Sequence, residues 1–120
     1  MEYLSIFLVA LVALEHIYIL VLEMFLWTNR RTRKIFGITK EDAETSKILA
    51  ANQGLYNGFL SAGLVWGLLH PTDPVGQQIQ IFFLGCVMVA AMYGGLTAKK
   101  SIIIVQGLPA LLAFCSLFFV

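Results

Sequence analysis

Three ionisable side chains interrupt a strongly apolar segment near the start of the sequence. The segment LEHIYILVLEMFLW, residues 14–27, contains Glu15, His16 and Glu23. Imidazole and carboxyl groups are common general acids and bases, and on a helix the spacing of His16 and Glu23 puts both on one face. Glu15 is turned from that face by about 100°. The spacing therefore predicts His16 and Glu23 as a catalytic proton donor and acceptor that point into the same interior.

Amide and phenol side chains recur in the other apolar segments of the chain. At a rise of about 1.5 Å per residue, Glu23 and Asn52 are expected at one level of a helical bundle, and His16 and Asn57 at a deeper one. Such groups can orient a small molecule in a pocket. The residues predicted to bind this ligand are Glu15, Tyr18, Asn52, Gln53, Tyr56, Asn57, Tyr93 and Gln106.

The composition of the chain makes these polar groups unusual. Of 120 residues, 59% are hydrophobic and 12% are charged, and the mean hydropathy is +0.84. These values lie outside the range of soluble globular proteins, so the lipid bilayer is the expected partner. A charged side chain at the centre of a membrane helix costs about 2.5 to 3.5 kcal/mol, so Glu15 and Glu23 should face the protein interior. A net charge of +1 gives no support to nucleic-acid binding.

Four apolar stretches are each about 20 residues long, the length that crosses a bilayer as a helix. Short connections require neighbouring helices to pack together, mostly antiparallel. A chain of this length forms one domain. The prediction is an all-α fold, in which residues 1–120 form a single four-helix transmembrane bundle. The expected spans are about 4–27, 46–69, 78–98 and 102–120.

The second stretch carries two pairs of glycines at the spacing that allows close helix packing in membranes. Gly54 and Gly58 form one pair, and Gly63 and Gly67 form the other. At about 100° per residue, the two pairs lie on opposite faces of a helix. We therefore expect other helices to approach this one from both sides.

The basic residues indicate an orientation, because Lys and Arg accumulate in the cytoplasmic loops of membrane proteins. All eight lie in or beside residues 28–45 and 99–101, whereas the connection HPTDPVG has none. These two basic segments are predicted to be cytoplasmic. Both termini are then extracytoplasmic, and the chain is predicted to be a multi-pass protein of the cell (plasma) membrane.

Residues typical of helix ends support these boundaries. Thr39 followed by Asp42 resembles a capping box at the start of the second helix. Asp73 and Pro74 resemble the N-cap and first-turn proline of the third. In the fourth helix, Pro109 lacks an N–H and leaves the carbonyl of Val105 without an intrahelical partner. A neighbouring polar group or a ligand is expected to bind that carbonyl.

No metal and no cofactor are predicted. Cys86 and Cys115 lie in apolar segments without metal-binding spacing, and both are expected to be buried. His16 and the two glutamates show neither the H-x-x-x-H nor the E-x-x-H spacing with which one helix presents two ligands to a metal. His70, directly before Pro71, is interpreted as a helix-end residue.

Three functions fit this pattern. The preferred one is binding of a small hydrophobic molecule, with its conversion by acid-base chemistry, for example by an isomerase. The second is a structural or partner-binding membrane protein, in which the polar groups only hydrogen-bond across helices. The third is a proton-linked transporter of a small solute, in which Glu15, His16 and Glu23 relay charge. A second copy of the chain is also a candidate partner, because one copy is small for a permeation path.

Two sequence segments resemble a known family. The first is LEHIYILVLEMFLWTNRRTRKIFG, and the second is AANQGLYNGFLSAGLVWG, which contains the Asn-Gln-Gly-x-Tyr-Asn pattern of residues 52–57. The chain resembles short bacterial and fungal membrane proteins catalogued as domain of unknown function 1304. The likeness covers nearly the whole chain. It implies a multi-pass membrane protein, and it carries no activity to this chain.

Overall fold

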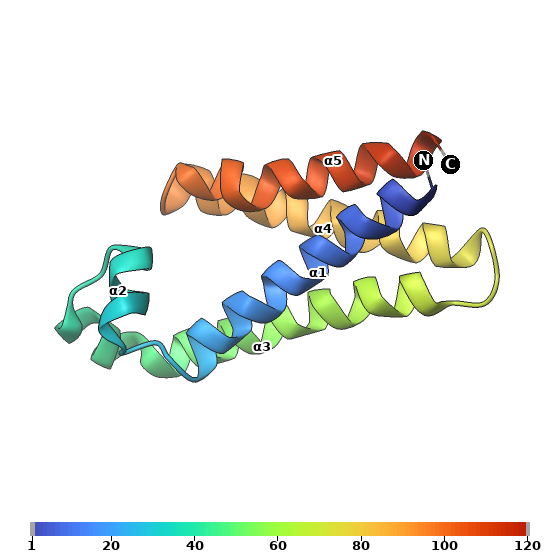
Figure 1. Ribbon diagram of the computed structural model, residues 1–120. Helices are drawn as coiled ribbons and strands as arrows, with labels where there is room; N and C mark the ends of the chain where they lie inside the picture. The colour runs from blue at the N-terminus through green and yellow to red at the C-terminus, as the bar shows by residue number, and fades with distance from the viewer. Residues whose placement is uncertain (1, 120) are drawn as a thin grey trace. The chain divides into compact units, whose positions relative to one another are not determined.

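The computed structural model describes residues 2–119, which form five α-helices and no strand. The all-α class is therefore confirmed. A π-helical turn, Ile103–Gly107, precedes the last α-helix, and a 3-10 turn, Leu117–Phe119, follows it. The α-helices, labelled in Figure 1, are α1 (Glu2–Met24), α2 (Arg30–Phe36), α3 (Lys40–Leu69), α4 (Val75–Thr97) and α5 (Leu108–Ser116).

The helices pack in two compact units. The first unit contains residues 2–15 and 60–119, and the second contains residues 16–59. The long helices α1 and α3 each contribute residues to both units. The interpretation of residues 1–120 as a single four-helix domain therefore stays a prediction.

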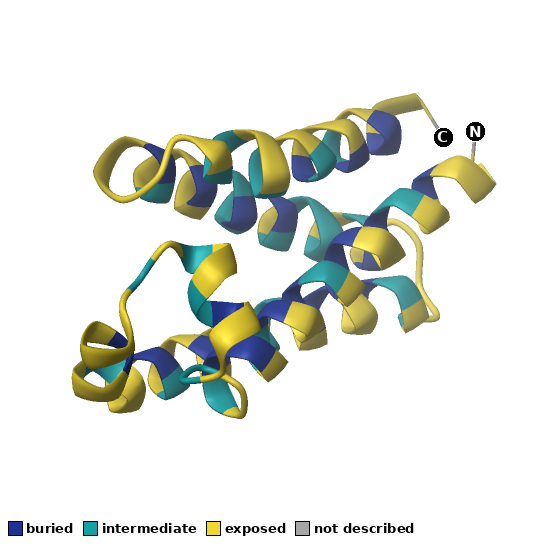
Figure 2. Ribbon diagram, turned by 60° about the vertical axis from the view of Figure 1, so that its left-hand side comes forward, coloured by how far each residue is buried: buried dark blue, intermediate teal, exposed yellow. Residues whose placement is uncertain are grey.

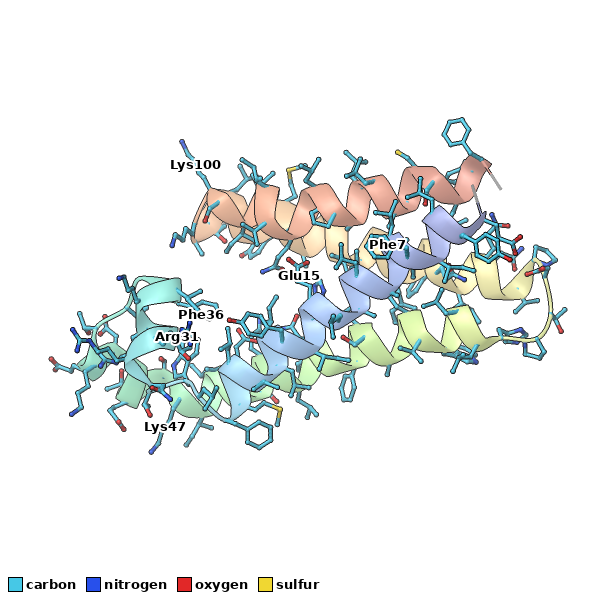
Figure 3. All side chains as sticks on the ribbon, viewed as in Figure 1. Phe7, Glu15, Arg31, Phe36, Lys47 and Lys100 are labelled. Atoms are coloured by element: carbon cyan, nitrogen blue, oxygen red, sulfur yellow. The ribbon has the colours of Figure 1, made fainter. Side chains whose placement is uncertain are left out.

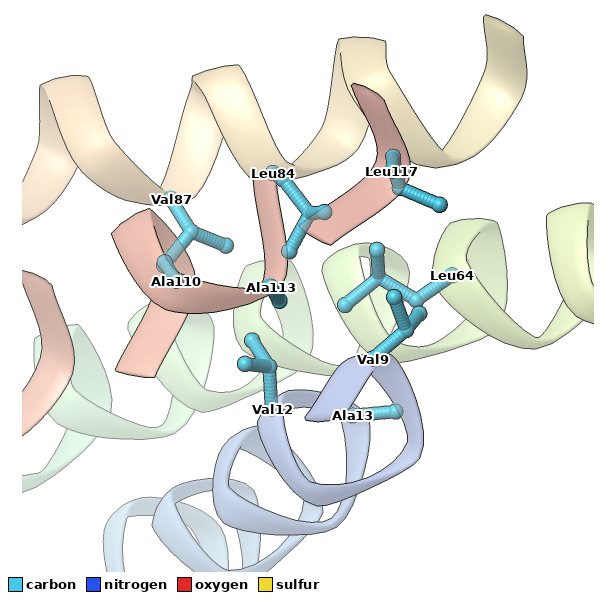
Figure 4. Packing of buried hydrophobic residues seen from close by; sticks show 9 residues of the cluster. All are labelled: Val9, Val12, Ala13, Leu64, Leu84, Val87, Ala110, Ala113 and Leu117. Carbon is cyan, nitrogen blue, oxygen red and sulfur yellow. The ribbon is translucent and has the colours of Figure 1, made fainter. Parts of the chain in front are cut away.

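The core of the first unit is built from branched aliphatic and small side chains. Here α4 and α5 lie side by side (Figure 1), and alanines on α5 leave room for larger side chains from the other helices. Close packing of this kind is typical of protein interiors. Figure 4 shows the cluster, which consists of Val9, Val12, Ala13, Leu64, Leu84, Val87, Ala110, Ala113 and Leu117.

The glycine pairs of α3 lie where two other helices approach it most closely. A Cβ atom added at Gly54 or Gly58 would meet side chains of α1, within the second unit. A Cβ atom added at Gly63 or Gly67 would meet side chains of α4, within the first unit. The expectation that helices pack on two faces of this segment is confirmed. The absence of a side chain at these four positions allows the close contacts.

The start of α3 agrees with the sequence prediction, and the start of α4 differs from it. The backbone N–H of Asp42 donates a 3.0 Å hydrogen bond to Thr39 Oγ1, so the cap predicted for α3 is confirmed. The prediction that Asp73 caps the third helix is wrong. Pro74 holds the cap position of α4 without a side-chain hydrogen bond, and the helix begins at Val75, one residue after the predicted first-turn proline.

The short helix α2 was not predicted within the basic segment 28–45. Asn29 precedes it, and Gly37 ends it with φ of 68°, a left-handed conformation that glycine adopts without strain. The backbone N–H of Gly37 donates to the carbonyl of Arg33. Asn before a helix and Gly after it are sequence signals of helix ends, so this element was detectable.

A π-helical turn, Ile103–Gly107, lies directly before the α-helix that contains Pro109. In a π-helix the hydrogen bonds join residue i+5 to residue i rather than i+4 to i. The regular α-helical pairing is thus interrupted close to the residue that has no N–H to donate. The expectation that a neighbouring polar group or a ligand binds the Val105 carbonyl stays a prediction.

Two helices within residues 2–119, α1 and α4, are long and apolar enough to cross a membrane. The polar residues and glycines of 52–58 make α3 less apolar, and the apolar helix Ile103–Phe119 is shorter. Figure 2 shows exposed positions along every helix, and many of them carry large apolar side chains. Even Cys115 is exposed and Cys86 only partly buried, so the expectation that both are buried is wrong. Large apolar surfaces are typical of proteins that contact lipid or partners.

Ser61→Ala is expected to lower the stability of the first unit. Ser61 is buried and its hydroxyl donates a 2.7 Å hydrogen bond to the carbonyl of Ala13 on α1. Interhelical hydrogen bonds of this type contribute about 0.6 to 2 kcal/mol in membrane proteins. Thermal unfolding in detergent measures the effect. Ser101→Ala, at an exposed position, is the control; equal midpoints for the two variants would contradict the prediction.

Candidate functional site

The candidate site lies in the second unit, where the end of α1 runs antiparallel to α3 (Figure 1). Gly54 permits this approach, because a Cβ atom there would lie 2.7 Å from Met24 Cγ and 3.1 Å from Glu23 Cβ. At Gly58, a Cβ atom would lie 2.6 Å from Leu20 Cδ1. The close approach brings the polar side chains of α3 within reach of Glu23.

Glu23 is only 8% exposed, as expected for a carboxyl group that faces the interior. The Nδ2 amide of Asn57 donates to its Oε1 at 2.7 Å and also donates to the carbonyl of Gln53 at 3.2 Å. Asn52 lies beside Glu23, as expected, because both line one pocket. Asn57, which was expected deeper with His16, also reaches Glu23 through its side chain. Side chains lean toward the N-terminus of their own helix, and in antiparallel helices Glu23 and Asn57 lean toward each other.

A pocket of about 330 Å³ opens beside Glu23. Asn52 and Gln53, two of the predicted ligand-binding residues, line it together with Glu23. Amide and carboxyl groups together supply hydrogen-bond donors and acceptors to a bound molecule. The remaining lining residues are Trp27, Ser46, Leu49 and Ala50.

Trp27 forms a rigid wall of this pocket. Its indole Nε1 donates a 3.1 Å hydrogen bond to Ser46 Oγ, and that hydroxyl donates to the carbonyl of Asp42 at 2.6 Å. The indole also contacts the edge of the Phe36 ring, with centroids 4.9 Å apart. Figure 3 labels Phe36 on α2. Neither Trp27 nor Ser46 was predicted as a site residue, although both mark the ends of the expected spans and so were expected at one level.

His16 is 1% exposed and is not among the residues that line this pocket. The burial agrees with an interior imidazole. Tyr18 and Tyr56 are exposed, and the Tyr56 ring packs edge-on against Phe59 at 5.6 Å rather than against Glu23. Their assignment as catalytic or ligand-binding residues stays a prediction.

The other three predicted site residues belong to the first unit. Glu15 Oε1 is buried and has no hydrogen-bond partner within residues 2–119 (Figure 3 labels this residue). Tyr93 is exposed on α4, where its backbone carbonyl accepts a hydrogen bond from Thr97 Oγ1 at 2.7 Å. Gln106 is partly buried in the π-helical turn. Their predicted role in binding stays untested.

Within the described part of the chain, no group of three or more His, Cys, Asp or Glu side chains is placed to hold a metal ion. The chemistry available beside Glu23 is hydrogen bonding and proton exchange by one carboxyl group and neighbouring amides.

Comparison with known proteins identifies the family. The model of the family described as "Protein of unknown function (DUF1304)" matches residues 10–118. The chain belongs to the DUF1304 family. A DUF1304 resemblance was already evident in the segments that carry His16, Glu23 and Asn57.

A related chain is the "Uncharacterized protein YpaA" of Lactococcus lactis subsp. lactis (strain IL1403). It is 39% identical to this DUF1304 protein over 121 residues, which cover 99% of this chain and 100% of the relative. No solved structure matches the chain.

Proposed function

We propose that this DUF1304 protein binds a small amphiphilic molecule in the Glu23 pocket, with the polar end of the ligand on Glu23, Asn52 and Gln53. The presence of this pocket is the observation that supports the proposal. Its volume of about 330 Å³ is at the small end of the range of about 300 to 1,000 Å³ for ligand pockets. Trp27 and Leu49 supply apolar surface for the rest of the ligand.

The membrane setting is part of the same proposal. In it, the chain crosses the cell membrane four times as one bundle, with 28–45 and 99–101 in the cytoplasm and both termini outside. The positions of the basic residues support this topology. The Glu23 pocket, next to Trp27 at the end of the first span, then opens near the cytoplasmic interface. An amphiphilic ligand is suited to that level of a bilayer, where apolar and aqueous surroundings meet.

Binding is favoured over acid-base conversion by the arrangement of the ionisable groups. Conversion needs a donor and an acceptor within reach of one ligand. Glu23 lines the pocket, whereas His16 is buried outside its lining. Glu23 is thus the one ionisable group for which contact with the ligand is proposed.

A structural role is the second candidate, and the hydrogen bond between Asn57 and Glu23 favours it. A buried carboxyl group that already has an amide donor 2.7 Å away can serve to fix the packing of α1 against α3. Such a protein needs no ligand. A variant that fills the pocket but leaves this hydrogen bond intact separates the two candidates.

Leu49→Trp is that variant. Leu49 is exposed and lines the pocket without touching the Asn57 to Glu23 hydrogen bond, so the added indole should occupy ligand space and leave the helix contact unchanged. Native mass spectrometry of the purified protein is expected to detect a bound small molecule in the natural chain and a loss of most of it in Leu49→Trp.

Leu55→Trp is the matched control, because Leu55 is exposed on the same helix and does not line the pocket. It should retain the bound molecule. Equal retention by both variants, or a natural chain without any bound molecule, would leave the structural role as the better account.

A further inference from the structure

A second and larger pocket lies in the first unit. Its volume is about 580 Å³. It is formed where the first turns of α1 and α4, the last turn of α3, the connection between α3 and α4, and the end of the chain meet. This size falls within the range of about 300 to 1,000 Å³ that is typical of small-molecule sites.

The charged groups of this second pocket are acidic. Glu2 and Asp73 both line it, and within residues 2–119 neither carboxylate forms an ion pair. No Lys or Arg is among the lining residues. Two carboxylates with no Lys or Arg among the described lining residues favour a positively charged ligand.

Ser5 is an independent sign that the pocket is made for a polar ligand. Its side chain lines the pocket and is 3% exposed, and its hydroxyl has no hydrogen-bond partner in the described part of the chain. Its Oγ atom is not among the solvent-excluded polar atoms without a partner in residues 2–119, so it is reached through the pocket. A ligand that donates a hydrogen bond to Ser5 Oγ would supply the missing partner.

The neighbouring polar side chains keep acceptors available to a ligand. Gln80 Nε2 donates to the carbonyl of Gly67 at 3.1 Å, and Gln77 Nε2 donates to the carbonyl of Leu117. Each glutamine thus uses one of its two N–H donors on the backbone and retains its Oε1 acceptor. His70 Nδ1 accepts a hydrogen bond from the N–H of Thr72 at 3.1 Å. These contacts fix the wall of the pocket.

Four other lining residues are apolar. Ile6, Leu68, Leu117 and Phe119 supply aliphatic and aromatic surface. The pocket therefore combines anionic acceptors with an apolar wall. A primary ammonium group, which carries three N–H donors and a positive charge, matches the acceptors, and a short hydrocarbon or aromatic body matches the wall.

We propose that this second pocket binds a small primary amine with an apolar body, held by Glu2, Asp73 and Ser5. This site is separate from the Glu23 pocket and does not depend on its function. A free amine suits the site better than an aminophospholipid headgroup, because the lipid phosphate would lie close to the same two carboxylates and be repelled by them.

The test uses 2-phenylethylammonium as the probe and 2-phenylethanol as its uncharged analogue. Both are titrated into the purified full chain in a nonionic detergent at neutral pH, with binding followed by saturation-transfer NMR. The ammonium is expected to bind about tenfold more tightly than the alcohol, because hydrogen bonds between two charged groups are stronger than those of a neutral hydroxyl. Equal affinity for the two probes would overturn the proposal.

Glu2→Gln and Asp73→Asn are the matched variants, and each is expected to weaken ammonium binding about tenfold. Both side chains are exposed, so the fold should tolerate the changes. Retained binding of 2-phenylethanol confirms an intact pocket in each variant. The control is Glu41→Gln, an exposed acid on the first turn of α3 outside the pocket. Unchanged ammonium affinity in both pocket variants would overturn the proposal.

A last experiment distinguishes a free amine from a lipid headgroup as the source of the ammonium group. Phosphatidylethanolamine is added in place of the free amine, in the same detergent, as a competitor of the bound probe. It is expected to displace none of the 2-phenylethylammonium beyond the effect of phosphatidylglycerol. Specific displacement would overturn the assignment to a free amine.

Discussion

Gly76→Ala is expected to destabilise the protein by about 1 to 3 kcal/mol, the usual cost of forcing extra volume into a packed contact. A Cβ atom at this position would lie 2.6 Å from the carbonyl oxygen of Gly67 and 3.2 Å from His70 Cβ. The Gly67 carbonyl cannot easily move away, because it also accepts the hydrogen bond from Gln80 Nε2. The contact is between two backbones, so no side-chain rotation relieves it.

Gly85→Ala on the same helix is the control for this prediction. A Cβ atom at Gly85 would meet nothing within 4 Å, and replacing Gly by Ala within a helix stabilises it by up to about 1 kcal/mol. The two substitutions are chemically identical and are expected to have opposite effects on the unfolding midpoint in detergent. A Gly76→Ala protein at least as stable as Gly85→Ala would show that α3 and α4 are not in backbone contact.

The sequence predicted the features of the fold that depend on local pattern. The all-α class, the Thr39 cap and the two glycine faces of α3 follow from helix periodicity and capping chemistry, which a single sequence displays. The sequence did not predict features for which neighbouring residues are similarly suited to one position, such as the cap of a helix. Asp73 looked like a cap, but the chain turns before α4 with Pro74 in that position.

The candidate site was predicted in composition but not in pairing. Glu23 was expected to lie in the interior with amides of the second span, and it does. Asn52 lies beside Glu23 as expected, but the hydrogen bond from Asn57 was not predicted. Counting residues from the membrane edge places Cα atoms and ignores the lean of side chains along antiparallel helices. The acidic pocket of the first unit was missed, since Asp73 is far from Glu2 and Ser5 in sequence and the three residues belong to no motif.

The pairing of Glu23 with Asn57 predicts a non-additive pattern of stabilities. Asn57→Leu removes the amide and leaves a carboxyl group that is 8% exposed without its 2.7 Å donor. An unsatisfied buried polar group costs about 1 to 3 kcal/mol, and more when it is charged. Glu23→Met should cost less, because the Asn57 amide keeps its hydrogen bond to the Gln53 carbonyl.

The double variant Glu23→Met with Asn57→Leu is expected to be more stable than Asn57→Leu alone, since replacing both partners by apolar groups of similar shape can be nearly neutral. Thermal unfolding of the four proteins in one detergent gives the coupling energy, expected at about 1 kcal/mol or more for residues in direct contact. Asn52→Leu makes the same chemical change at an exposed residue of α3 and should have little effect. Additive effects of Glu23→Met and Asn57→Leu would mean that the carboxyl group does not depend on this amide, and the helix contact proposed to shape the Glu23 pocket would then lack its main polar interaction.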